Sequence, residues 1–153
     1  MAHPQTPSEM SLPGVRSVFE TNVFGLIQTT TAFIPLLRKA KPGYGNIVQN
    51  SMESASGTYQ SSSTRFLAPF AAYCMSKAAI NMYSIALAKE LKQDRIKVNC
   101  LCPGFTTTKL NGYAPGGKTP AEGAKLLIEW SLLGPEDGEK TGKYWSADGE
   151  VPW

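Results

Sequence analysis

Ala72-Tyr73-Cys74-Met75-Ser76-Lys77-Ala78-Ala79 opens the strongest helical stretch of the chain, which runs from Phe70 to Leu91. Its interior is rich in alanine, and so many small side chains on one helix predict a close approach to a neighbouring backbone. The alternating segment Arg95-Ile96-Lys97-Val98-Asn99-Cys100-Leu101 follows and predicts a strand, which Pro103-Gly104 ends. A long helix that leads into such a strand is typical of an α/β fold with a parallel sheet.

The same alternation of helices and strands extends in both directions from this segment. Upstream, the pattern predicts a helix from Pro13 to about Lys39 with a kink or break near Pro35, a strand over Gly45–Asn50 and a loop over 51–69. Downstream, it predicts a loop over 104–118, a capping box at Thr119-Pro120-Ala121-Glu122, a helix to about Leu133 and a last strand over Lys143–Ser146. The order α-β-α-β-α-β predicts a partial Rossmann-type doubly wound parallel sheet of about three strands with flanking helices.

The domain organisation follows from this order. Residues 1–12 are polar and contain proline, so we expect a loose N-terminal arm, with residues 13–153 forming the C-terminal portion of a Rossmann-type domain. The first helix has no strand before it, and about three strands is fewer than the roughly 5–6 of a typical sheet. We therefore expect that the N-terminal half of such a fold is missing from the chain.

The composition excludes several classes of function. The 153 residues carry a formal net charge of +3 without a cluster of lysine or arginine, which argues against nucleic-acid binding. The one histidine, His3, lies in the polar leader, which argues against a histidine-built metal site. No apolar run approaches the ~18 residues of a membrane span. The three cysteines are odd in number, and Cys100 and Cys102 stand two apart on one expected strand, so we expect reduced thiols in a cytoplasmic protein.

The candidate chemistry starts with Tyr73 and Lys77, which stand four residues apart and so share one face of their helix. An ammonium group beside a phenol favours the phenolate and is expected to lower the tyrosine pKa, which makes the phenol a usable general acid or base. On the spacing alone, a tyrosine at the edge of the core beside a solvated lysine is the more common arrangement.

The surrounding segments resemble the short-chain dehydrogenase/reductase family over about residues 8–153. The resemblance rests on the Tyr-x-x-x-Lys helix leading into a strand that ends in Pro-Gly, and on three further segments in the same order. These are Glu20-Thr21-Asn22-Val23-Phe24-Gly25, Gly45-Asn46-Ile47-Val48-Gln49-Asn50-Ser51 and the ending Asp148-Gly149-Glu150-Val151-Pro152-Trp153. The ending looks like the carbonyl-reductase-like branch of the family.

The resemblance implies a role for each matching residue. Tyr73 would exchange a proton with the substrate oxygen while a nicotinamide transfers hydride, and Lys77 would hold the nicotinamide ribose and tune Tyr73. Asn22 would position a water behind Lys77. Pro103, Gly104, Thr106 and Thr108 match positions that contact the cofactor. For Asn22, Thr106 and Thr108, ordinary helix-kink or loop polar groups remain the alternative.

The catalytic serine is ambiguous. The family usually has two adjacent serines after this strand and the second acts on the substrate, whereas here the pair reads Ser51-Met52. A thioether cannot donate a hydrogen bond, so Ser51, or Ser54 if the loop shifts, is the candidate.

The resemblance implies NADP or NAD as cofactor, with NADP slightly favoured, and a small carbonyl or alcohol substrate. The glycine-rich turn that grips the pyrophosphate has no counterpart among the 153 residues, so we expect impaired cofactor binding. Three further hypotheses remain open: a homodimer through the two long helices, an inactive fragment acting as an interaction or regulatory subunit, and a P-loop at Gly112–Thr119, which formally reads G-x-x-x-x-G-K-T.

Overall fold

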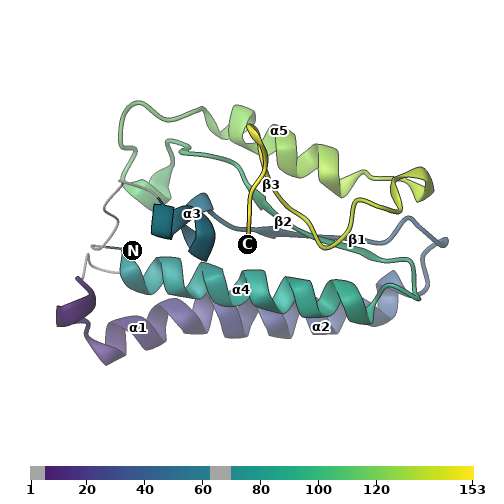
Figure 1. The fold of residues 1–153 in the computed structure, drawn as a ribbon, viewed down its shortest axis with the longest axis horizontal. Coiled ribbons are helices and arrows are strands. Elements are labelled where there is room, and N and C mark those ends of the chain that lie inside the picture. Colours follow the sequence, from purple (N-terminus) through teal and green to yellow (C-terminus); the bar gives the residue numbers. More distant parts are fainter. Residues whose placement is uncertain (1–5, 63–69) are drawn as a thin grey trace.

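The computed structural model describes residues 6–62 and 70–153. It has three layers: α2 (Gly25–Leu37) and α4 (Ala71–Glu90) cover one face of a sheet, and α5 (Pro120–Ser131) covers the other (Figure 1). α1 (Leu12–Phe19) packs against α4 in the layer of α2 and α4. The remaining helical elements are short: η1 (Pro7–Glu9), η2 (Glu20–Phe24), η3 (Glu53–Ala55), α3 (Gly57–Ser62), η4 (Lys109–Asn111) and η5 (Pro135–Asp137). The arrangement confirms the partial Rossmann-type α/β fold.

The sheet has the strand order β1-β2-β3-β4. The strands are β1 (Asn46–Asn50), β2 (Lys97–Cys102), β3 (Tyr144–Ser146) and β4 (Gly149–Glu150). The first three are parallel, as predicted, with Val48 opposite Asn99 and Leu101 opposite Trp145. The expected count of three is one too low, because β4 returns antiparallel on β3; at two residues it is too short to produce an alternating pattern.

The first long helix differs from its prediction in where it is irregular. Residues 20–24 form a π-helical turn in which the Gly25 N–H donates to the Glu20 carbonyl, five residues back. The helix then continues through Pro35 and ends at Leu37. The break expected near Pro35 therefore corresponds to the end of the helix two residues later. Within the expected loop 51–69, the described residues form η3 and α3, and residues 63–69 lie outside the described part of the chain. Residues 1–5 of the expected arm, His3 included, also lie outside it.

The core consists of three apolar clusters that tie the layers together. One packs α2 and α4 on the starts of the strands, around Leu91 and Val98. A second joins α4 to β2 and β3 around Ile80, Cys100 and Tyr144. The third packs Trp130 of α5 on Leu101 from the opposite face. β2 is buried along its whole length, which is the pattern of a central parallel strand covered on both faces.

Two smaller expectations can be checked directly. Cys74, Cys100 and Cys102 are all free, as predicted from their number and spacing. Among the helices of residues 6–62 and 70–153, none has the length and apolarity that crossing a bilayer requires.

Candidate functional site

The candidate residues lie where the parallel strands β1 and β2 end. Ser51 follows β1, and Pro103 and Gly104 follow β2, so both segments reach the same edge of the sheet. Tyr73 and Lys77 are on the first turns of α4, which packs against β2. The carboxyl ends of parallel strands are where α/β proteins place their binding sites.

Tyr73 and Lys77 share one face of α4, as their spacing predicts. The Lys77 Nζ lies 5.5 Å from the centroid of the Tyr73 ring. The same Nζ donates a 2.8 Å hydrogen bond to the backbone carbonyl of Asn50, the last residue of β1. Lys77 is only 9% exposed, so the alternative of a solvated lysine is wrong.

Burial shifts the pKa of both groups, in opposite directions. It raises the pKa of Tyr73 above its usual value, and Cys74 and Cys102 act in the same direction. It also lowers the pKa of Lys77. The expectation that Lys77 lowers the tyrosine pKa is therefore wrong here, because the loss of water around the phenol outweighs an ammonium that faces the ring and bonds to Asn50.

Asn22 is joined to α4 by a side-chain hydrogen bond. The π-helical turn η2 carries Asn22, whose Nδ2 donates to Ser76 Oγ at 3.0 Å. Ser76 Oγ in turn donates to the Tyr73 carbonyl at 2.7 Å. Asn22 is thus connected to the backbone of Tyr73 through Ser76, and its expected action on a water behind Lys77 stays a prediction.

Ser51 is buried and its hydroxyl is engaged. Its Oγ donates to Asn81 Oδ1 at 2.6 Å, and it is 4% exposed. The next residue, Met52, accepts a hydrogen bond from the Tyr144 hydroxyl at its backbone carbonyl. Ser54, the other candidate, is half-buried on η3. The segment after β1 is thereby attached to both α4 and β3.

Asn81 and Tyr144 were missed by the sequence reasoning. Asn81 had a detectable signal, because it extends the series Tyr73, Lys77 by another four residues on the same helical face. Tyr144 had none, because its contact with Met52 joins residues 92 positions apart.

The loop after β2 uses its polar groups locally. Gly104 has φ +79°, in the left-handed region, and a Cβ there would come within 3.0 Å of Lys118 Nζ. Thr106 Oγ1 donates to the Gly104 carbonyl at 3.2 Å, and Thr108 caps η4. Both threonines therefore have the structural roles of the open alternative, and their contacts with a cofactor stay predictions.

Gly112–Thr119 does not have the setting of a P-loop. A P-loop follows a buried strand directly, whereas β2 ends at Cys102 and Gly112 caps η4. Lys118 Nζ donates to the Pro103 carbonyl at 3.1 Å, and Thr119 Oγ1 donates to the Glu122 carboxylate at 2.7 Å. The P-loop alternative is therefore wrong, because among the described residues no strand leads directly into Gly112 and the Thr119 hydroxyl caps α5.

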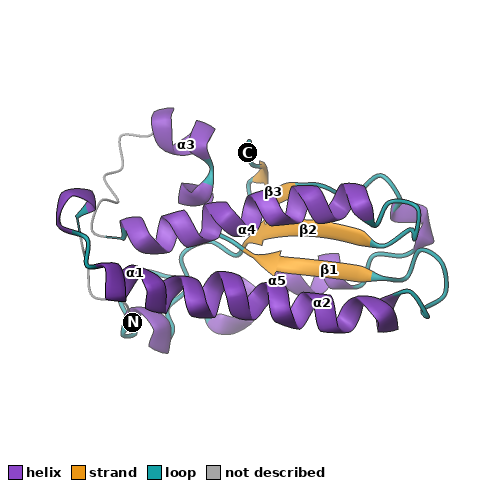
Figure 2. Cartoon of the chain, turned by 90° about the horizontal axis from the view of Figure 1, so that it is seen from below, coloured by secondary structure: helices purple, strands orange, loops and turns teal. Residues whose placement is uncertain are grey.

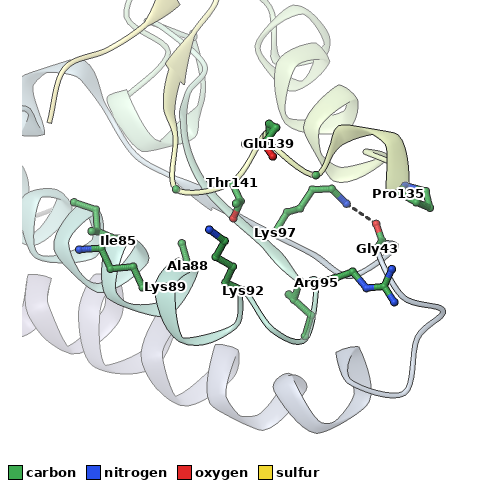
Figure 3. A pocket seen from close by; sticks show the side chains of 13 residues that line it. Gly43, Ile85, Ala88, Lys89, Lys92, Arg95, Lys97, Pro135, Glu139 and Thr141 are labelled. Atoms are coloured by element: carbon green, nitrogen blue, oxygen red, sulfur yellow. Dashed lines mark hydrogen bonds between the residues drawn. The ribbon is translucent and has the colours of Figure 1, made fainter.

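A cavity of about 510 Å³ lies at the other end of the sheet, between the end of α4, the start of β2 and the Pro135–Asp137 turn (Figure 3). None of the candidate site residues lines it. Its basic side chains point in different directions: Lys97 reaches sideways to the Gly43 carbonyl, while Lys89 and Arg95 diverge. The cavity is thus separate from the candidate site.

Comparison with known proteins identifies similar sequences. The family model described as "short chain dehydrogenase" matches residues 1–117. The chain is 38% identical over 123 residues to short-chain dehydrogenase anuI of Penicillium roqueforti, covering 78% of this chain and 48% of that protein. It is 29% identical over 140 residues to benzil reductase ((S)-benzoin forming) IRC24 of Saccharomyces cerevisiae, covering 86% and 50%. The chain thus spans about half the length of these two relatives.

Solved structures show the same likeness in three dimensions. A short chain dehydrogenase of Shigella flexneri complexed with NADP has a TM-score of 0.76 at 28% identity, covering 96% of this chain and 59% of that one. The NADPH-bound carbonyl reductase from chicken fatty liver has a TM-score of 0.79 at 23% identity, covering 100% and 62%. The second match, at its low identity, supports the fold alone.

Proposed function

Because the chain belongs to the short-chain dehydrogenase family, we propose that it takes part in NAD(P)H-dependent reduction of a small carbonyl compound, or in the reverse oxidation of an alcohol. The observation that carries the proposal is the pairing of Tyr73 with the buried ammonium of Lys77 at the carboxyl edge of the sheet. Reduction is favoured by the carbonyl-reductase-like ending of the sequence and by the reductase among the relatives.

The proposed chemistry needs a proton donor beside the substrate oxygen, and Tyr73 fills that role. Its raised pKa keeps the phenol protonated at neutral pH, which is the form that donates to a carbonyl oxygen as that oxygen gains charge. The nicotinamide cofactor supplies the hydride when bound. Lys77 places a positive charge on the face of the phenol ring, which favours the anionic phenol left after the proton transfer.

The residues at the site fit one end of the cofactor. An ammonium has three donors, and among the described residues Lys77 directs one of them to Asn50, so two remain for ribose hydroxyls. The 153 residues contain no glycine-rich turn for the pyrophosphate. We therefore expect this chain to bind NADPH weakly, because only the nicotinamide end of the cofactor has a matching site. Of the two nucleotides, NADP is proposed over NAD, since the structure of the Shigella relative is a complex with NADP.

Ser51 is assigned a positioning role within the proposal. Its proton is directed at Asn81, so donation to a substrate would break a buried hydrogen bond. Ser54 is the other candidate serine and is assigned the contact with substrate. Asn22 acts on Tyr73 through Ser76.

The proposal is tested by following the loss of NADPH absorbance in the presence of a small aromatic diketone such as benzil, at millimolar NADPH to offset weak binding. We expect slow turnover that Tyr73→Phe reduces by about 10²–10⁴-fold, the usual contribution of a positioned proton donor. Tyr83→Phe is the matched control, because Tyr83 is half-buried on the same helix and faces the core cluster at the strand starts. No turnover by the unaltered chain, or equal losses in both variants, would contradict the proposal.

A further inference from the structure

We propose that the cavity between the end of α4, the start of β2 and the Pro135–Asp137 turn binds a small monocarboxylate with an apolar body, of the class of medium-chain fatty acids. Figure 2 shows the arrows of β1 and β2 pointing toward the start of α4, where Tyr73 and Lys77 lie, so this cavity is at the opposite end of the sheet. The inference does not rest on the proposed activity, and its test measures binding rather than turnover.

The cavity has the size and the apolar surface of a small-molecule site. Its volume of about 510 Å³ falls within the roughly 300–1,000 Å³ of such sites. Ile85 and Ala88 of α4 and Ile96, just before β2, contribute apolar surface to the lining. This surface favours a ligand with a hydrocarbon body over inorganic phosphate or sulfate, which have none to bury.

The charge of the lining is predominantly positive. Its basic members are Lys89, Lys92, Arg95 and Lys97, and its acidic member is Glu139. Lys97 is buried and donates a hydrogen bond from its ammonium group to the Gly43 carbonyl. The other three basic side chains form no hydrogen bond or ion pair within residues 6–62 and 70–153. An anion in the cavity would therefore meet positive charge that is not already neutralised.

Lys92 and Thr141 provide the place for the carboxylate. Figure 3 shows their polar ends directed toward one another, whereas Lys89 and Arg95 point away. Thr141 Oγ1 accepts a 3.1 Å hydrogen bond from the Val98 N–H, and its own proton has no acceptor in the described part of the chain. A carboxylate here would accept one hydrogen bond from the ammonium and one from the hydroxyl.

The carbonyl groups at the end of α4 are largely satisfied, so they do not strongly oppose an anion. The Leu91 carbonyl accepts from the N–H groups of Asp94 and Ile96, and the Lys92 carbonyl accepts from the Arg95 N–H. Carbonyls without donors are what give the end of a helix its partial negative charge. The local bonds of this turn therefore leave the lysine charge as the dominant feature.

The nearby carboxylates limit the charge of the ligand. Glu139 lines the cavity, and Asp137 and Glu136 are close enough to Lys97 to act on it electrostatically. Asp137 is paired with Lys140 at 2.8 Å. A polyphosphate would be repelled by these carboxylates, whereas a single carboxylate needs only the two donors described above.

The test titrates octanoate into the full 153-residue chain by isothermal titration calorimetry. We expect one saturable site that binds octanoate about tenfold or more tightly than octanol, which lacks the charge, or acetate, which lacks the apolar body. Lys92→Gln should weaken octanoate binding about tenfold or more, and Lys92→Arg should retain it. Lys125→Gln is the control and should bind normally, because it removes the same charge from an exposed position of α5.

Chemical shifts of backbone amides locate the site without requiring any variant to fold. Octanoate should shift the amides of Gly138 and Gly142, which line the cavity, and leave the amide of Gly104, at the candidate catalytic site, unchanged. The proposal is overturned if octanoate does not bind, if Lys92→Gln binds it as well as the unaltered chain, if octanol or inorganic phosphate binds as tightly, or if the shifts gather around Gly104.

Discussion

Tyr144→Phe is expected to destabilise the chain and loosen the segment after β1. Tyr144 is fully buried, its ring stacks on Trp153 at 5.3 Å between centroids, and its hydroxyl donates to the Met52 carbonyl. Phenylalanine preserves the ring and its stacking, so the substitution removes this hydrogen bond and leaves the Met52 carbonyl without that donor.

The size of the effect follows from what is lost. Leaving a buried acceptor unsatisfied costs about 1–3 kcal/mol. In a domain of about 150 residues, each 1 kcal/mol lowers the melting temperature by roughly 2–4 °C, so a loss near 2 kcal/mol lowers it by roughly 4–8 °C. Burial holds the Tyr144 pKa far above its usual value, so the hydroxyl remains a donor throughout the neutral range.

The assay is urea unfolding followed by circular dichroism, with the melting temperature measured in parallel. Tyr113→Phe is the control, because Tyr113 is 67% exposed and should change the free energy of unfolding by less than about 0.5 kcal/mol. A Tyr144→Phe variant as stable as Tyr113→Phe would refute the reasoning, since the hydroxyl would then hold nothing in place.

Three further outcomes are expected. Ser51→Ala should lower the free energy of unfolding by about 1–3 kcal/mol, and a double-mutant cycle with Asn81→Ala should give a coupling energy of about 1 kcal/mol. If the two losses simply add, the hydrogen bond between Ser51 and Asn81 does not contribute to stability. Thr119→Ala should cost about 1 kcal/mol in urea unfolding through the lost capping box, and no change would contradict the cap. Burial raises the pKa of Cys100 to about 11, so little of its thiol is ionised at pH 8. A thiol reagent should therefore label the half-buried Cys74 before Cys100 at pH 8, and labelling of Cys100 should accelerate as the pH rises toward 11. Equal labelling rates of the two cysteines at pH 8 would contradict the burial of Cys100.

Periodicity and end signals predicted the main elements closely. The helix expected over Phe70–Leu91 is observed over Ala71–Glu90, and the capping box at Thr119 begins α5 as predicted. These features are local: apolar spacing and cap residues act over one or two turns, so a single sequence contains them.

The features that escaped prediction depend on distant contacts or on very short elements. Burial of Tyr73 reverses the expected direction of its pKa, and burial is a property of the assembled layers. The bond between Ser51 and Asn81 joins residues 30 positions apart, so only the packing of β1 on α4 reveals it. The helix α3 arises in a segment rich in serine, glycine and threonine, where weak local preferences do not predict its six residues.

The π-helical turn at Glu20–Phe24 accommodates one more residue than a regular helical turn would. Deleting one residue there would therefore restore a regular hydrogen-bond ladder and leave α1 and α2 close to their present phase. The contact between α1 and α4 would survive, whereas the side chain that now donates to Ser76 would be lost or displaced along the turn. The extra residue of the turn thus serves the bond between Asn22 and Ser76 more than it serves the packing of the two helices.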